Sequence, residues 1–247
     1  MSNNENISVM SHLDELRKRL TIIAAVNIGA AMLLFYKAGS ILDYFLAINP
    51  GMQLVYITPS ELLGVYIQLS FIMAFVLCSP ITGYQVWAFV KEGLYDNEKK
   101  YIVISLIFGV ICFIAGVAFC YYMVLPTTLG FFVRIAIADV ESMISVKSYI
   151  SFINTMLVSF GAVFEMPVLV FLLTRLRIMK PEFLKKNKGI IIVLIFVAAA
   201  VITPPDVISQ TMLGIPMVLL LEISTKICVM VDKTNKKRQT VYNNLSL

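Results

Sequence analysis

Residues 102–125 read IVISLIFGVICFIAGVAFCYYMVL, a run of 24 residues without one charged side chain. At about 1.5 Å per residue, a helix of this length reaches roughly 36 Å, enough to cross the ~30 Å hydrocarbon core of a bilayer. Similar stretches recur along the 247-residue chain, in which 59% of residues are apolar and only 14% are charged. Soluble domains carry about 25% charged residues. The sequence therefore predicts an integral membrane protein built from helices, with the lipid bilayer as its solvent.

Six stretches of this kind predict six transmembrane helices in an all-α membrane protein. We place them at about 20–36, 62–90, 102–125, 149–174, 189–202 and 207–227. At ~1.5 Å per residue the fifth reaches roughly 21 Å and the second roughly 43 Å, so we expect unequal spans with the last two helices short. In this prediction residues 1–231 form a single transmembrane domain, and residues 232–247 form a basic cytoplasmic tail without regular structure.

The distribution of basic residues predicts the orientation. Of the lysines and arginines in alternate connections, 17 fall on the side that includes both termini, and only Lys37, Arg134 and Lys147 fall on the other. Cytoplasmic connections carry the excess of these residues, so both termini are predicted in the cytoplasm. Topology also explains the net charge of +5. Because the basic residues form no continuous stripe, we expect no nucleic-acid binding.

The sequence lacks the signatures of nucleotide hydrolysis and zinc chemistry. It contains no Walker loop, no HExxH, no GxSxG and only one histidine, His12. The four cysteines, Cys78, Cys112, Cys120 and Cys228, lie in apolar runs without CxxC spacing, and we interpret them as small buried hydrophobic residues. The N-terminal residues lack the basic start of a secretory signal. We therefore expect no cofactor, no metal and no enzymatic activity.

Three segments carry charged or aromatic side chains that have both a functional and a structural interpretation. Glu15 precedes Arg19 by four residues in an amphipathic helix that sets topology. Residues 87–100 fit an aromatic belt followed by a solvated loop. Glu165 is harder to explain, because an ionisable group at a helix centre costs about 2.5–3.5 kcal/mol. With Pro167 beside it we expect a bent helix, and a structural hydrogen bond and a docking site are equally open.

Several segments, taken in order, resemble the TatC family, the multispanning subunits of the twin-arginine protein translocase. The match runs through nearly the whole chain, and its specificity comes from the combination of motifs. They are HLDELRKRL (12–20), YQVWAF (84–89), GLY (93–95), FG (160–161), FEMPV (164–168), TPPD (203–206), SQ (209–210) and IP (215–216).

The resemblance implies a receptor in the bacterial cytoplasmic membrane for signal peptides that carry paired arginines. Such a receptor works with TatA-type and TatB-type single-span partners, and with further copies of itself, to export folded proteins using the proton-motive force. By motif position, the resemblance assigns two glutamates and three neighbouring residues to signal-peptide binding, one glutamate to an intramembrane partner contact, and two residues to periplasmic functions. The signal-peptide residues are Glu15, Glu98, Arg17, Phe89 and Leu94. The partner contact is Glu165, and the periplasmic residues are Pro50 and Asp206.

The chemistry of two carboxylates agrees with this assignment. A guanidinium is a rigid planar fork that binds a carboxylate through two hydrogen bonds, whereas a lysine ammonium is a compact, hydrated point charge. Two separated carboxylates can therefore select two arginines. The chain departs from the family at Glu92, where proline is common, and at Leu62 and Leu63, where alanine and phenylalanine are common. Glu92 adds a carboxylate near the predicted site, so Glu98 need not act alone.

A second hypothesis is a proton-coupled transporter of small solutes. Glu165, and with it Glu222 in the last predicted span, would then relay protons through the helix bundle. Many transporters are built from internal repeats, and we find none here. The sequence therefore favours the translocase receptor over the transporter.

Overall fold

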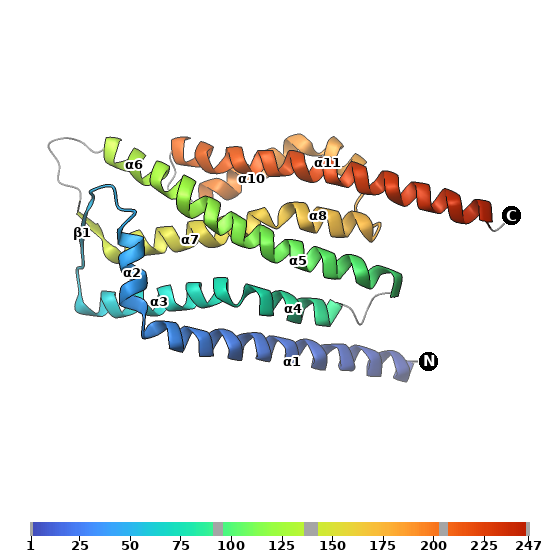
Figure 1. Cartoon of the computed structure of the whole chain (residues 1–247), viewed down its shortest axis with the longest axis horizontal. Coiled ribbons are helices and arrows are strands. Elements are labelled where there is room, and N and C mark those ends of the chain that lie inside the picture. The colour runs from blue at the N-terminus through green and yellow to red at the C-terminus, as the bar shows by residue number, and fades with distance from the viewer. Residues whose placement is uncertain (1, 91–95, 136–142, 203–206, 246–247) are drawn as a thin grey trace.

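The computed structural model describes residues 2–90, 96–135, 143–202 and 207–245, which form an elongated bundle of helices (Figure 1). Both chain termini lie at one end of the bundle, which we call the terminal end, while β1 and α2 lie at the other, which we call the strand end. Five helical segments of the described residues are long and apolar enough to cross a membrane. These are Leu13–Phe35, Pro59–Leu77, Lys100–Arg134, Val146–Arg175 and Leu213–Asn235.

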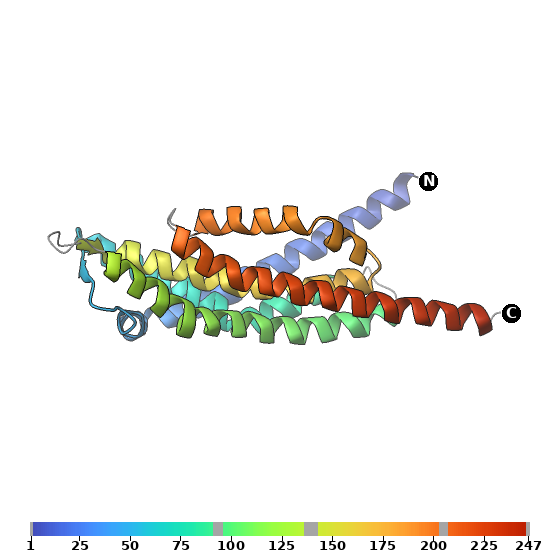
Figure 2. The ribbon, with the colours of Figure 1, turned by 90° about the horizontal axis from the view of Figure 1, so that it is seen from above.

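The last two helices differ in length, so only half of the prediction that both are short is correct. Helix α10 (Lys188–Ile202) has 15 residues and reaches roughly 22 Å, as expected for a short fifth span. Helix α11 (Val207–Leu245) has 39 residues. We predicted that this span ends near residue 227 and that an irregular tail starts at residue 232, but a helix that leaves the bilayer can continue with polar side chains. Seen from above, α10 and α5 (Asp96–Phe119) lie on opposite sides of α11 (Figure 2).

The predicted second span, 62–90, consists of two helices. Helix α3 (Pro59–Leu77) ends at Cys78, and α4 (Ser79–Val90) begins directly after it. Proline at position 80 has no N–H to donate and is tolerated in the first turn of a helix, which explains why the break falls here. Helix α1 (Ser2–Phe35) packs along both α3 and α4.

The third span continues through the proline that we expected to end it. Helix α5 (Asp96–Phe119) passes into a π-helical turn (Cys120–Val124) and then into α6 (Leu125–Ile135), which contains Pro126 in its first turn. The wider π-helical turn accommodates a residue that cannot donate a regular α-helical hydrogen bond. The helical run is therefore longer than the predicted 102–125.

The fourth span is broken at Glu165, as the neighbouring proline predicted. Helix α7 (Val146–Phe164) ends with Glu165 as its C-cap, and the same residue is the N-cap of α8 (Met166–Arg175), whose first turn contains Pro167. A short helix, α9 (Pro181–Lys186), then leads into α10. The break places a carboxylate inside the membrane-spanning segment Val146–Arg175, nearer to its Arg175 end.

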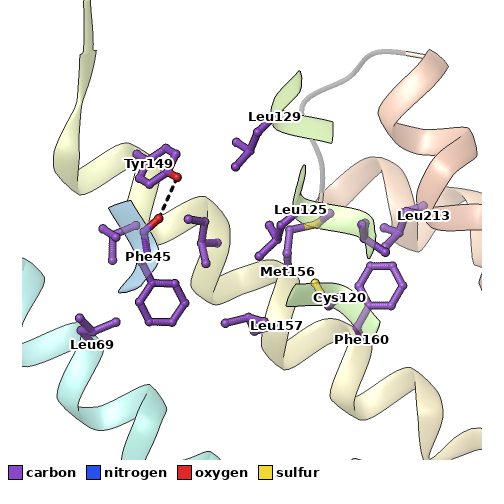
Figure 3. Close-up of a cluster of buried hydrophobic side chains, with 14 of the residues drawn as sticks. Phe45, Leu69, Cys120, Leu125, Leu129, Tyr149, Met156, Leu157, Phe160 and Leu213 are labelled. Atoms are coloured by element: carbon purple, nitrogen blue, oxygen red, sulfur yellow. Dashed lines mark hydrogen bonds between the residues drawn. The ribbon is translucent and has the colours of Figure 1, made fainter. Parts of the chain in front are cut away.

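The strand end is closed by a short helix and a pair of strands. Helix α2 (Ala38–Leu46) packs on α3, and strand β1 (Gln53–Val55) pairs in parallel with β2 (Met143–Ser145), with Leu54 opposite Ile144. The Tyr149 hydroxyl of α7 donates a 3.0 Å hydrogen bond to the carbonyl of Phe45 in α2 (Figure 3). The largest buried apolar cluster begins here and extends to Phe160 and Leu213.

Candidate functional site

Glu15 is anchored to a neighbouring helix through Arg19. Its Oε1 atom accepts from Arg19 Nε at 2.6 Å and also lies 2.6 Å from Nη2, which confirms the predicted pairing at a spacing of four residues. Arg19 Nη1 then donates to Oε1 of Gln85 in α4 at 3.0 Å. The Glu15 side chain is 21% exposed. Its carboxylate is therefore oriented by contacts between α1 and α4 while remaining open to solvent.

The structure describes some of the other residues predicted for signal-peptide binding but not all of them. Arg17 is exposed on α1, and Phe89 is half-buried in the last turn of α4. Glu98 belongs to the first turn of α5, but its side chain, like the whole of Leu94, lies outside the described residues. Because α4 packs against both α1 and α5, the structure brings the helices that carry these residues together at the terminal end (Figure 1).

Glu165 lines a cavity of about 470 Å³ between α4, α5 and the junction of α7 with α8. Its carboxylate lies against Gly109 of α5, where a Cβ atom would come within 3.0 Å of Oε2. Within the described part of the chain, no hydrogen-bond donor reaches this carboxylate, and the hydroxyls of Ser79 and Thr82, which line the same cavity, are also buried without a partner. The cavity thus holds a half-buried carboxylate and two buried hydroxyls that have no hydrogen-bond partner among the described residues.

Unsatisfied polar groups in an apolar region cost free energy, so such groups normally have a partner. Of the two alternatives left open for Glu165, a structural hydrogen bond is not formed with any described residue. The arrangement therefore fits a polar group supplied from outside the chain.

Pro50, predicted as a periplasmic functional residue, is exposed in a tight turn at the strand end. Asn49 holds this turn through two hydrogen bonds with Met52, its Oδ1 accepting from the backbone N–H at 2.8 Å and its Nδ2 donating to the carbonyl at 2.9 Å. Gly51 has a φ of 105°, a conformation that side-chain-bearing residues rarely adopt. Asp206, the second residue predicted for this role, lies outside the described residues.

Glu61 connects the two segments of the strand end, and our sequence analysis did not single it out. Its Oε1 accepts from the Ser145 hydroxyl and from the backbone N–H of Lys147 at 3.0 Å, and its Oε2 accepts from the backbone N–H of Ile57 at 2.9 Å. The signal was present, because Thr58 and Glu61 have the spacing of a helix capping box. The contacts across to residues 145–147 could not be predicted from that spacing.

Glu222, a candidate for the proton relay, forms a salt bridge with Lys188 of α10 at the terminal end. Both side chains are partly exposed, with 40% and 46% of their surface accessible. The pairing joins α10 to α11.

The described residues contain no group of three potential metal ligands. All four cysteines are free; Cys78, Cys120 and Cys228 are buried, whereas Cys112 is partly exposed. The interpretation of the cysteines as buried hydrophobic residues therefore holds for three of the four.

Comparison with protein families gives one match that covers most of the chain. Residues 11–216 match the family described as Sec-independent protein translocase protein (TatC). The TatCy protein of Bacillus subtilis is 36% identical over 221 residues, which cover 88% of this chain and 87% of that protein. TatC of Helicobacter pylori strain J99 is 35% identical over 94% of this chain and 93% of that protein. TatC of Escherichia coli K12 is 35% identical over 90% of this chain and 88% of that protein.

A solved structure has a similar fold over most of the chain. The crystal structure of the twin-arginine translocase receptor TatC superimposes with a TM-score of 0.79 at 33% sequence identity. The match covers 89% of this chain and 99% of that one. A second crystal structure of the same receptor, in the detergent DDM, gives the same TM-score.

Proposed function

Because the chain belongs to the TatC family of Sec-independent protein translocase proteins, we propose that it is the receptor subunit of a twin-arginine translocase. It is a multi-pass membrane protein, and its terminal end binds paired-arginine signal peptides on the cytoplasmic side of a bacterial cytoplasmic membrane. The excess of lysine and arginine in the connections at this end supports the orientation. Labelling of single introduced cysteines at the two ends with a membrane-impermeant reagent tests it.

The observation that carries this proposal is that only one oxygen of the Glu15 carboxylate has a described hydrogen-bond donor. Both contacts from Arg19 go to Oε1, and no described donor reaches Oε2. Arg19 therefore keeps the carboxylate oriented while one oxygen stays available to an incoming guanidinium. A charge-assisted hydrogen bond of this kind is about twice as strong as a neutral one. We assign Glu98, in the first turn of the adjacent α5, as the second carboxylate, and we assign Arg17, Phe89 and Leu94 to the same site.

Export of a folded reporter protein tests the two carboxylates. Losing one charge-assisted hydrogen bond of about 1.5–3 kcal/mol reduces signal-peptide binding roughly 10-fold to 150-fold, so Glu15→Gln and Glu98→Gln should each lower export of a reporter with an Arg-Arg signal. Glu182→Gln, an exposed glutamate of α9 at the same end, is the matched control. Undiminished export in both variants would remove the carboxylates from the site.

We assign the Glu165 cavity to a partner contact. The carboxylate and the hydroxyls of Ser79 and Thr82 form a polar patch that a hydrogen-bonding side chain of a TatA-type or TatB-type single-span helix can satisfy. Export driven by the proton-motive force would then depend on this contact. Co-purification of the partners should persist in Glu165→Gln, which keeps a hydrogen-bonding group, and fall in Glu165→Leu, which removes it. Equal recovery with both variants would argue against a polar contact.

The remaining assignments concern the strand end and the assembly. We propose that Pro50 and Asp206 act on the periplasmic side and that several copies of the chain assemble in the active complex. The exposed, clasped turn at Pro50 supports the first proposal, since it presents a fixed backbone to solvent. Cross-linking between copies of the chain tests the assembly, and the same experiment with Pro50→Ala tests the role of Pro50.

A further inference from the structure

A second cavity lies between α5, α8 and α11 and shares Ser105 and Val168 of its lining with the cavity at Glu165. It has a volume of about 340 Å³. Helix α8 packs against both α5 and α11 and forms its floor. The walls include Ile104 and Phe108 of α5, Pro167 and Phe171 of α8, and Ile227 and Met230 of α11.

The interior of this cavity offers apolar contacts. The hydroxyl of Ser105, which also lines it, donates a 2.8 Å hydrogen bond to the carbonyl of Tyr101 and is therefore satisfied. Along α5 the lining runs from Ile104 to Cys112, a length of about 12 Å at 1.5 Å per residue. The shape and chemistry suit a hydrocarbon chain.

A cation lies one helical turn beyond the cavity lining, on the terminal-end side. The guanidinium carbon of Arg175, one turn beyond Phe171, lies 3.8 Å from the ring centre of Tyr101 in α5. Its Nη1 donates to the side-chain oxygen of Asn235 in α11, and the Asn235 amide donates to the carbonyl of Thr174 at 3.1 Å. Arg175 thus bridges the two helices that flank the cavity.

The bridge lies where charged side chains follow the apolar lining. Arg175 is the last residue of α8, Lys100 precedes Tyr101 in α5, and Asp232 and Lys233 precede Asn235 in α11. Basic and aromatic side chains of this kind are typical of the head-group region of a bilayer. A guanidinium has five N–H donors, and the only recorded acceptor of Arg175 among the described residues is Asn235. Exposed Lys100 lies one helical turn from Ile104 on α5. Donors therefore remain for an anion at this end of the cavity.

We propose that the groove between α5 and α11 binds an anionic phospholipid, with one acyl chain in the cavity and the head-group phosphate on Arg175. A helix is an unsuitable occupant, because a helical segment about 10 Å wide and 12 Å long fills roughly 900 Å³, more than the space available. The positive charge at this end of the cavity complements the phosphate, as basic sites between transmembrane helices do for anionic lipids. The bound lipid replaces direct packing between α5 and α11.

Quenching of tryptophan fluorescence by brominated lipids tests this proposal. The chain has one tryptophan, so Trp87→Phe gives a silent background, into which Met230→Trp places a probe at the 70% exposed rim of the groove. Leu219→Trp, 59% exposed on the same helix but away from the groove, is the control probe. Purified protein is reconstituted in phosphatidylcholine vesicles that contain brominated phosphatidylglycerol or brominated phosphatidylcholine.

At position 230 we expect half-maximal quenching at about fivefold lower content of brominated phosphatidylglycerol than of brominated phosphatidylcholine, the ratio that corresponds to ~1 kcal/mol per basic residue. Arg175→Gln should abolish this preference while keeping an amide for Asn235, and the exposed neighbour Arg177→Gln should leave it intact. Ile227→Phe, which fills the cavity without changing charge, should reduce quenching by both lipids at position 230 only.

Three results would overturn the proposal. The first is the same lipid preference at positions 230 and 219. The second is an equal loss of preference in Arg175→Gln and Arg177→Gln, which would show general attraction of anionic lipid to a basic face. The third is no quenching at position 230 by either lipid, which would show that protein covers the groove. Each readout is independent of export activity.

Discussion

Replacing Gly116 of α5 by alanine would place a methyl group 2.6 Å from the backbone carbonyl oxygen of Phe160 and 2.8 Å from Cβ of Phe164, both in α7. Neither atom can move aside by a side-chain rotation, so α5 and α7 would have to separate. Overpacking of this kind costs typically 1–3 kcal/mol. Alanine gains about 0.4–1 kcal/mol over glycine in a helix, which leaves a net destabilisation of up to about 2.6 kcal/mol, with a central value of about 1.3 kcal/mol.

Two other glycines serve as graded controls. At Gly161 the added methyl group would meet the Phe113 ring at 2.6 Å, and the ring can rotate, so the loss should be smaller than at Gly116. At Gly64, on the exposed side of α3, nothing lies within 4 Å, and alanine should be stabilising. The midpoint of thermal unfolding of the purified protein in detergent, followed by loss of monodisperse protein, gives the order Gly64→Ala, wild type, Gly161→Ala, Gly116→Ala. A Gly116→Ala variant as stable as Gly64→Ala would refute close contact between α5 and α7.

Three further changes test contacts at the two ends of the bundle. Tyr149→Phe removes the hydroxyl donor from the Phe45 carbonyl of α2, which keeps only the 3.4 Å contact from the backbone N–H of Ile48, and should lower the free energy of unfolding by about 0.5–1.5 kcal/mol; an unchanged value in chemical unfolding would contradict the bond. Glu61→Ala should speed hydrogen exchange of the two backbone amides that it binds, whereas Glu182→Ala should not, as mass spectrometry can show. A double-mutant cycle of Lys188→Ala and Glu222→Ala should give a coupling of at most ~1 kcal/mol, because the pair is partly exposed; a larger value would indicate a desolvated pair.

The positions of the membrane segments could largely be predicted from the sequence, because a long run of uncharged residues indicates a helix in contact with lipid. The residues at which the helices end could not be predicted in this way. Pro126 was expected to stop a helix but is accommodated after a π-helical turn, and α11 continues where its apolar residues stop. Both errors arise because hydropathy marks the bilayer and not the hydrogen bonding of the backbone. The bend at Glu165 was predictable, since Pro167 acts on the backbone locally.

The candidate site was predictable in part. The pairing of Glu15 with Arg19 follows from helical spacing and is confirmed. The link from Arg19 to Gln85 joins residues 66 positions apart, and the cluster of Arg175 with Tyr101 and Asn235 joins three helices. Such contacts depend on how helices are arranged around one another, and a single sequence contains no direct signal for them.

Because α11 is one continuous helix, a change in bend near one of its ends would move the other end over a larger distance. Pro216 lies near its strand end, and the 29 residues from there to Leu245 extend about 44 Å at 1.5 Å per residue. A change in bend of about 10° at this proline would swing the far tip by roughly 8 Å, by the geometry of a rigid rod. A small change in the bend at Pro216 would thus produce a larger displacement at the C-terminal end of α11. Distances between spin labels on the tip and on α1 would reveal that swing, and a fixed distance in all states would exclude it.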